Sequence, residues 1–247
     1  MAPSVELALH RGRTVARFCC MSDGARKHYR IFIQARMNSQ RFPGKMLADF
    51  RGRPLIGQIL SRFASIDEAE RCVVLTSVEE TDDPLAEYVA SLGSVSVFRG
   101  PLDDVFQRFR LCLDAYPCDW MVRISGDSPL LDPQLPATMM KLASQDVDLV
   151  TNVARRTFPP GQSVECIRAR CFGDIDESTL TASQREHVTG AYYEPSRGFR
   201  LRRVMSLLSG APAMTIDEPD DLPRVAALAD SSWGEAGRFA SFATTEA

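Results

Sequence analysis

Short apolar runs alternate with helix-like stretches along residues 30–151, and this alternation constrains the fold more than any other feature of the sequence. The apolar runs are bounded by polar residues and are too short for helices, which is typical of buried strands. We predict strands at 30–34, 71–76, 95–99, 120–125 and 147–151, and helices at 54–64, 84–91, 102–115 and 133–143, the last capped by Asp132. The alternation predicts an α/β fold with a doubly wound, mostly parallel sheet and helices on both faces.

The alternation stops after residue 151. Residues 155–170 contain the turn signal Pro159-Pro160-Gly161, which favours a hairpin or arm over another crossover unit. Beyond it we predict a helix at 183–193, strands near 199–204 and 213–216, and a last helix at 219–229. The chain thus divides into a poorly ordered N-terminal extension at 1–28, a domain at 29–230 whose β-hairpin or arm elaboration covers about 155–204, and a weakly ordered tail at 231–247.

The composition is that of an ordinary globular protein. Charged residues make up 25% and apolar residues 45% of the chain, and the formal net charge is −3, which argues against a nucleic-acid partner. No apolar run approaches the roughly 18 residues needed to span a bilayer, and none of signal-peptide length follows the N-terminal arginines. The seven cysteines are odd in number and form no Cys-x-x-Cys pair, which fits reduced thiols. We therefore expect a cytoplasmic protein with no nucleic-acid or membrane partner.

A basic, turn-rich segment at 35–45 directly follows the first predicted strand. It carries Arg36, Arg41 and Lys45, and loops at the carboxyl ends of strands are where open α/β sheets bind ligands. Three cations, with the Ser39 hydroxyl and backbone N–H groups, suit a polyphosphate. Pro43-Gly44 marks a turn that aims Lys45 back toward the strand end. The alternative is a solvated basic loop, and no Walker sequence is present.

Two aspartates follow predicted strands and suit a divalent cation. Asp127 lies in the segment 123–130, where Gly126 permits close backbone approach to a ligand, and Asp217 follows the predicted strand at 213–216. Triphosphate chemistry needs a metal ion, and Mg²⁺ is typically held by one or two carboxylates with phosphate oxygens and water. The alternative role for each aspartate is to cap the following helix, and for Asp217 taken alone the local pattern favours capping, with Asp221 close by.

Other polar residues have two interpretations each. Asp104 either contacts a ribose hydroxyl or sits at a helix start, where the macrodipole favours acids. Ser77 ends the second predicted strand, where it either hydrogen-bonds a base or ribose or is an ordinary serine after a strand. His187 either contacts the carboxylate or phosphate of an acceptor or packs in a helix. Arg123 and Ser125 point to the same side of their strand by period two, so both can face a nucleotide.

Several ordered segments together resemble the cytidylyltransferase family. They are residues 35–45, 99–105, 123–130, 161–165, 185–189 and 215–222, and the resemblance covers about residues 29–230. Within that family the chain looks like the SpsF-type proteins of spore-coat polysaccharide biosynthesis, which are related to the synthetases of CMP-3-deoxy-octulosonate and CMP-sialic acid. The resemblance implies a nucleotidyltransferase-type (nucleotide-diphospho-sugar transferase-like) fold, CTP as donor, Mg²⁺, release of pyrophosphate and commonly a homodimer.

Matched by motif, the resemblance also implies roles for single residues. Those implied as catalytic are Arg36, Arg41, Lys45 and Asp127; as Mg²⁺ ligands, Asp127 and Asp217; as nucleotide-binding, Ala35, Ser39, Ser77, Asp104, Arg123 and Ser125; and as acceptor-binding, Glu165, Glu186 and His187. Related sequences often have glycine where this chain has Asn38 and an acid where it has Ser163, and the second departure bears on the acceptor pocket.

We therefore expect Mg²⁺-dependent cytidylyl transfer from CTP to an acidic sugar or a related phosphate or phosphonate acceptor. Two alternatives stay open from the residues alone. One is a glycosyltransferase that uses a nucleotide sugar, with Asp127 again holding the metal. The other is a non-catalytic nucleotide-binding or interaction module.

Overall fold

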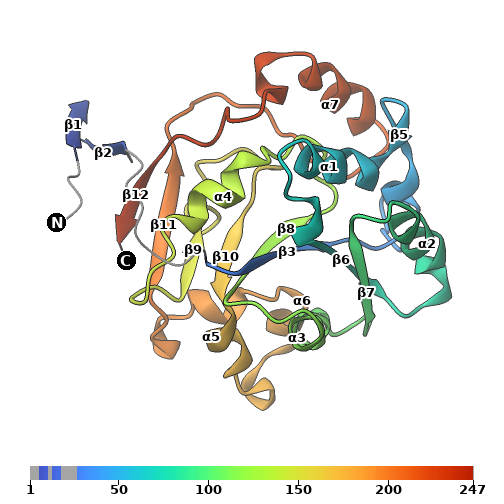
Figure 1. Cartoon of the computed structure of the whole chain (residues 1–247), viewed down its shortest axis with the longest axis horizontal. Helices are drawn as coiled ribbons and strands as arrows, with labels where there is room; N and C mark the ends of the chain where they lie inside the picture. The colour runs from blue at the N-terminus through green and yellow to red at the C-terminus, as the bar shows by residue number, and fades with distance from the viewer. Residues whose placement is uncertain (1–5, 11–12, 18–26, 247) are drawn as a thin grey trace.

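The fold is a three-layer α/β arrangement around one large sheet (Figure 1). A computed structural model describes residues 6–10, 13–17 and 27–246. The sheet has eight strands in the order β12-β11-β9-β10-β8-β3-β6-β7. Their bounds are β3 Tyr29–Gln34, β6 Cys72–Ser77, β7 Ser96–Gly100, β8 Trp120–Ser125, β9 Leu149–Thr151, β10 Glu165–Arg168, β11 Leu201–Ser206 and β12 Phe242–Glu246.

Most of these strands run in one direction. β3 pairs in parallel with both β6 and β8, β6 pairs in parallel with β7, and β9 with β11, whereas β10 and β12 run against their neighbours. The predicted doubly wound, mostly parallel sheet is therefore confirmed. Its consequence for function is that β3, β6, β7, β8, β9 and β11 all end at one edge, which is where such folds bind ligands.

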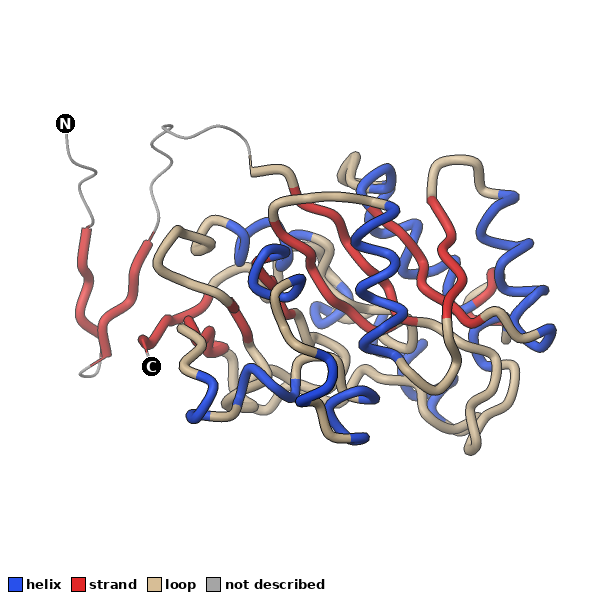
Figure 2. Tube along the Cα trace, turned by 90° about the horizontal axis from the view of Figure 1, so that it is seen from below, coloured by secondary structure: helices blue, strands red, loops and turns tan. Residues whose placement is uncertain are grey.

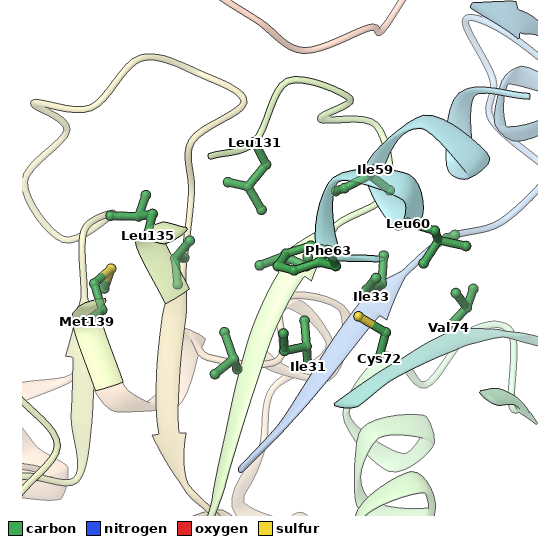
Figure 3. Packing of buried hydrophobic residues seen from close by; sticks show 14 of the residues in the cluster. Ile31, Ile33, Ile59, Leu60, Phe63, Cys72, Val74, Leu131, Leu135 and Met139 are labelled. Atoms are coloured by element: carbon green, nitrogen blue, oxygen red, sulfur yellow. The ribbon is translucent and has the colours of Figure 1, made fainter. Parts of the chain in front are cut away.

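Helices cover both faces of the sheet, each over its own apolar core. They are α1 Leu55–Ala64, α2 Asp83–Ser91, α3 Val105–Ala115, α4 Gln134–Met140, α5 Ala169–Gly173, α6 Ala182–Glu186 and α7 Asp221–Ala229. α1, α4 and α7 lie on one side and α3, α5 and α6 on the other (Figure 1). Phe63 of α1 is completely buried and packs beside Ile33 of β3, close to Cys72 and Val74 of β6 (Figure 3). Burial of these side chains is the main force that fixes the helices on the sheet.

The hairpin expected after residue 151 is present. β9 and β10 pair antiparallel, and the loop between them folds onto the body of the protein. Gln162, which is fully buried, accepts from the Asp132 amide at 2.9 Å and donates to the Leu130 carbonyl at 2.8 Å. Its own carbonyl accepts from the Asn152 side chain at 2.6 Å. The loop is therefore held to the body of the protein by buried hydrogen bonds.

Three local predictions from the sequence were wrong. Residues 213–216 form no ladder with another strand, because the amides of Met214 and Ile216 donate singly to the carbonyls of Pro160 and Asp127. The helix expected at 183–193 ends at Glu186, and a separate 3₁₀ turn, η5 Gly190–Tyr193, follows it. The tail expected to be weakly ordered supplies the 3₁₀ turn η7 Ser232–Gly234 and strand β12, which pairs with β11.

The N-terminal extension predicted at 1–28 lies largely outside the described residues. Within the described part, β1 Glu6–His10 and β2 Arg13–Arg17 form an antiparallel hairpin next to the β12 end of the sheet (Figure 2). A second small ladder joins β4 Asp49–Phe50 to β5 Arg53–Pro54. In the described part of the chain, no helix is long and apolar enough to cross a membrane.

Asp132 fastens the C-terminal region to the body of the protein. Asp132 is 1% exposed, and its carboxylate accepts from the amide of Gln134, the first residue of α4, at 3.0 Å. It also accepts from the Gly237 and Phe239 amides, each at 2.8 Å. A single buried carboxylate thus joins the start of α4 to a segment more than a hundred residues later.

We expect Asp132→Ala to lower the free energy of unfolding by about 3 kcal/mol, because buried amides lose a charged acceptor. The measurement is urea unfolding followed by circular dichroism. Asp114→Ala, an exposed aspartate on α3, is the matched control and should change the stability by less than about 0.5 kcal/mol. Equal losses for the two variants would contradict this role of Asp132.

Candidate active site

The basic loop after β3 folds back on itself. Gly44 has φ +76°, a left-handed conformation that glycine adopts without strain, and its amide donates to the Met37 carbonyl at 2.9 Å. The Lys45 amide donates to the Phe42 carbonyl at 3.2 Å, and Lys45 begins the 3₁₀ turn η1 Lys45–Leu47. The turn at Pro43-Gly44 therefore returns Lys45 toward the end of β3, as the sequence predicted.

The Lys45 ammonium group is the centre of the site. It lies 3.2 Å from Asp127 Oδ2 and 3.6 Å from Asp217 Oδ1, and it donates to the Ile216 carbonyl at 3.0 Å. The Lys45 side chain is only 8% exposed, whereas those of Asp127 and Asp217 are 22% and 36% exposed. The two predicted metal ligands are thus brought together, with solvent access on the carboxylate side.

Backbone contacts explain how Asp127 and Asp217 meet. Asp127 follows β8, and its carbonyl accepts from the Ile216 amide at 3.0 Å, so the segment before α7 runs beside the end of β8. The capping alternative for Asp217 is wrong, because α7 begins at Asp221 after Asp220 and has no side-chain cap, while Asp221 accepts from the amides of Asp217 and Glu218 at 2.8 and 3.0 Å. The Asp217 carboxylate is left for the cations of the loop.

Glycine at position 126 has a structural reason in addition to the predicted close approach to a ligand. A Cβ atom added there would lie 3.1 Å from Ala35 Cβ and 3.1 Å from a methyl group of Ile56. The Gly126 amide donates to the Gln34 carbonyl at 2.9 Å. Glycine at this position therefore lets the β8 end pack tightly against the β3 end, which brings the basic loop next to Asp127.

The two arginines of the loop differ in their surroundings. Arg41 is 61% exposed and pairs with Asp217 at 2.9 Å and with Glu218 at 3.6 Å. Arg36 is exposed, and no hydrogen-bond or ion-pair partner of its side chain is found among the described residues. Arg41 thus already neutralises a carboxylate, while Arg36 is free to meet an anion.

The donor set fits a magnesium ion, although it is small. Two carboxylates within 4 Å of one ammonium group match the one or two that Mg²⁺ takes when phosphate oxygens and water complete its shell. In the part of the chain that the structure describes, no group of three or more His, Cys, Asp or Glu side chains forms a closed protein cage. Asp127 and Asp217 suit a metal ion that arrives with a polyphosphate better than a permanently bound one.

A buried aspartate joins the basic loop to the end of β6. Asp82 is fully buried and accepts from the Met37 amide at 2.7 Å, from the Ser77 amide at 2.9 Å and from the Ser77 hydroxyl. Burial alone would raise the pKa of Asp82, but the Ser77 hydroxyl and the two amides outweigh it and lower that pKa. The predicted nucleotide residue Ser77 is therefore engaged with Asp82, which stays ionised near neutral pH.

A second polar cluster lies on the other side of Asp127, over β8, β9 and β10. Glu165, 2% exposed, accepts from Arg123 at 2.6 Å, from Thr189 at 3.1 Å and from the Tyr193 hydroxyl. Arg123 also donates to the Gln34 side chain at 3.2 Å. Burial and the charge of Glu165 raise the pKa of Tyr193, so its hydroxyl keeps its proton and donates it. Arg123 is fixed in place while remaining 27% exposed.

The other predicted residues are dispersed around these clusters. Asp104 caps α3 by accepting from the Gln107 amide at 2.9 Å and also pairs with Arg185. Ala35, Ser39 and Ser125 lie at or just after the ends of β3 and β8, at the same edge as Lys45. Glu186 and His187 are exposed, and the structure shows no side-chain contact between them and Glu165. The structure therefore brings Arg41, Lys45, Asp127 and Asp217 together but not the three predicted acceptor residues.

Sequence reasoning missed four residues that shape these clusters. They are Gln34, Asp82, Thr189 and Tyr193. Gln34 had a usable signal, since it is a polar residue at the end of a predicted strand beside the basic loop. The other three lie in stretches of ordinary polar composition, and only the tertiary fold shows what they contact.

Comparison with known proteins places this geometry in one family. Residues 31–203 match the family model described as Cytidylyltransferase, and the chain belongs to that family. Among curated relatives, the spore coat polysaccharide biosynthesis protein SpsF of Bacillus subtilis is 31% identical over 167 residues, which is 64% of this chain and 67% of SpsF.

Solved structures agree with the family assignment. A cytidylyltransferase from Leptospira borgpetersenii is similar with a TM-score of 0.77 and 29% identity, over 84% of this chain and 90% of that protein. A CMP:2-keto-3-deoxy-manno-octonic acid synthetase complexed with CTP has a TM-score of 0.61 and 16% identity, over 81% of this chain and 97% of that one. The second likeness shows the shared fold, and the nucleotidyltransferase-type fold expected from the sequence is confirmed.

We expect Asp82→Asn to lower the free energy of unfolding at pH 7 by about 1–2 kcal/mol, because three donors lose a charged acceptor. A carboxyl with a lowered folded pKa stabilises the protein above its unfolded pKa of about 4 and loses that effect as the pH falls further. The difference between wild type and variant should therefore shrink below about pH 4. Denaturant unfolding at pH 3 to 7 measures it, with exposed Glu80→Gln as control, and a difference independent of pH would refute this account.

Proposed function

We propose that this protein transfers the cytidylyl group of CTP, with Mg²⁺, to an acidic sugar or a related phosphate or phosphonate acceptor and releases pyrophosphate. The observation that carries the proposal is the Lys45 ammonium group held between the Asp127 and Asp217 carboxylates beneath a basic loop. Cations and carboxylates alternate there at the carboxyl edge of a parallel sheet, which suits a metal-bound polyphosphate.

The charges at this place support a nucleotide with its metal ion. The carboxylates of Asp127 and Asp217 offset the cations of Lys45 and Arg41, so the cluster by itself is close to neutral. Asp127 and Asp217 would hold Mg²⁺, which supplies positive charge against the phosphate oxygens and the leaving group. Lys45, Arg41 and Arg36 then face the remaining phosphate charge.

In the proposed reaction, an oxygen atom of the acceptor forms a bond to the α-phosphorus of CTP. The bond between that phosphorus and the oxygen bridging to the β-phosphate breaks, pyrophosphate leaves with the bonding electrons, and the acceptor proton passes to solvent. Lys45 and Arg41 stabilise the negative charge that develops on pyrophosphate, because their positions are fixed before the reaction. Little else is required of the protein beyond holding the two reactants in line.

The acceptor is proposed to bind over β8 and β10. Arg123 is partly exposed there, and it donates to Glu165 and Gln34, which hold it in a fixed position. Thr189 in turn donates to Glu165. The Glu165 carboxylate already accepts hydrogen bonds from Arg123, Thr189 and Tyr193. We therefore propose that Glu165 positions Arg123. Glu186, His187 and a homodimeric assembly remain part of the proposal through the family resemblance.

We expect Lys45→Met to lower kcat by roughly 100-fold or more, because a positioned cation that stabilises the leaving group is removed. The measurement of kcat is the rate of pyrophosphate release from CTP in the presence of candidate acceptors, divided by the concentration of folded protein. Lys141→Met, an exposed lysine after α4, is the matched control and should retain full activity. An unchanged kcat with a raised KM would mean that Lys45 only binds substrate.

Thermal unfolding with CTP, UTP, ATP and GTP, each with and without Mg²⁺, tests the function directly. A ligand at about 100 times its Kd should stabilise by roughly 2.7 kcal/mol, which raises the melting temperature of a chain this size by roughly 5–10 °C. We expect this rise for CTP with Mg²⁺, its loss in Asp127→Asn and its retention in the exposed control Asp114→Asn.

Two results would sink the proposal. A rise with nucleotide sugars but none with CTP would indicate a glycosyltransferase, in which the same carboxylates hold the metal ion. A rise with CTP that persists in Asp127→Asn, without pyrophosphate release on any acidic acceptor, would indicate a non-catalytic nucleotide-binding module.

A further inference from the structure

Among the residues that the structure describes, the buried guanidinium of Arg108 has no hydrogen-bond partner. Arg108, in the first turns of α3, is completely buried. The lack of a partner among the described residues holds for each of its three guanidinium nitrogens. Buried arginines normally have their five N–H donors paired, since an unpaired buried charge strongly destabilises a fold. Arg108 therefore needs an explanation that the packing of the unliganded protein does not supply.

The surroundings of Arg108 place it at the ligand-binding edge. Its aliphatic stem crosses Gly100 at the end of β7, where an added Cβ would lie 2.9 Å from Arg108 Cγ. Burial, together with the positive charge of Arg36, lowers the pKa of Arg108 to about 10, against an opposing effect of Asp82, so the group remains charged at neutral pH. Asp82 does not pair with it, because its oxygens accept from Met37 and Ser77.

The order of the sheet separates Arg108 from the acceptor side. Lys45 and Asp127 stand over the adjacent ends of β3 and β8 in the order β7-β6-β3-β8-β10. Glu165 and Arg123 lie on the β10 side, and Arg108 lies on the opposite side, beyond β6. If the phosphates occupy the middle and the acceptor lies over β10, the nucleoside, as the third group on the α-phosphorus, can extend over β6 and β7. Arg108 then lies on the nucleoside side.

We propose that Arg108 recognises the pyrimidine base of the nucleotide by donating two hydrogen bonds, to O2 and N3 of cytosine. This inference rests on the proposed function and deepens it by naming a residue that selects the base. The planar fork of a guanidinium matches two adjacent acceptors, and cytosine offers such a pair. Uracil has N–H at position 3, so the same fork meets a donor there and loses a hydrogen bond.

A base edge suits this position better than a phosphate. The Arg108 stem and the half-buried Phe98 ring both pack at Gly100, and Arg108 is completely buried, so a dianionic phosphate would have to shed its water to reach the guanidinium. The cytosine base is flat and neutral, so it loses far less favourable hydration when it is buried. The Arg108 nitrogens are covered in the unliganded chain, so this assignment requires the residues at the ends of β6 and β7 to move apart when the base binds.

Calorimetric titration with CTP, UTP and inorganic triphosphate, in the presence of Mg²⁺, tests the assignment. We expect Arg108→Met to weaken CTP binding roughly tenfold or more, to the level of UTP, and to leave UTP and triphosphate within about twofold. Arg110→Met is the matched control on the same helix, since Arg110 bonds the Ile175 carbonyl at 2.8 Å, and it should leave all three affinities unchanged.

The stability of the unliganded protein gives a second readout that separates binding from structure. Removing an unpaired buried charge should leave the melting temperature of Arg108→Met equal to or above that of wild type. A structural arginine would give the opposite, a clear fall. Arg108→Lys keeps the charge but cannot bridge two acceptors, so it should also lose the preference for CTP, and it decides the question if the methionine variant does not fold.

Each remaining outcome has a definite meaning. Equal binding of CTP and UTP by the wild type would overturn the inference and leave the proposed function intact. The same holds if the Arg108 variants keep the preference for CTP. An Arg108→Met variant that loses triphosphate as strongly as CTP shows that the group reads phosphate, which also overturns the base assignment. Wild type that binds none of the three ligands removes the proposed function itself.

Discussion

The rest of the site depends on one buried ammonium group, that of Lys45. It joins three chain segments that are far apart in sequence: the loop after β3, the end of β8 at Asp127, and the coil before α7 at Ile216 and Asp217. The Lys45 side chain is only 8% exposed. Removal of its ammonium group would leave the carboxylates of Asp127 and Asp217 facing each other with less positive charge between them. The same contacts that hold the segments together therefore place the carboxylates where a metal-bound polyphosphate can use them.

Polar groups around the site fall into two kinds. Asp82 and Glu165 are buried carboxylates with their donors already in place, and they fix the loop and Arg123 before any ligand arrives. The side chains of Arg36 and Arg108, in contrast, have no hydrogen-bond or ion-pair partner in the described part of the chain, and the first is exposed whereas the second is buried. Preorganised groups lower the entropic cost of binding, and unpaired ones leave interactions for the ligand to make. The division separates the groups that hold the site in shape from those available to contact a ligand.

Most of the fold was predictable because its signals are local. The five strands at 30–34, 71–76, 95–99, 120–125 and 147–151 were found, since each is a short buried run between turns. The strand predicted at 213–216 was wrong. The apolar pattern there suits a strand, yet the amides of Met214 and Ile216 donate to carbonyl groups of two different segments. The sequence did not predict β12, because this edge strand lies in a polar tail and is hydrogen-bonded to β11 alone. Of the site, Lys45, Arg41, Asp127 and Asp217 were predicted, whereas Asp82 and Tyr193 gave no local signal.

The sequence by itself determined the strand–helix alternation, and with it the edge at which the basic loop and Asp127 would lie, because parallel strands end together whatever their order. Tertiary structure alone decided the pairings. It paired Asp217 with Lys45 and Arg41, gave Glu165 three donors, and buried the Arg108 guanidinium without a partner among the described residues. The physical reason is that hydrogen bonds and ion pairs depend on distances of a few ångströms between segments far apart in the chain, and local patterns carry no information about those distances.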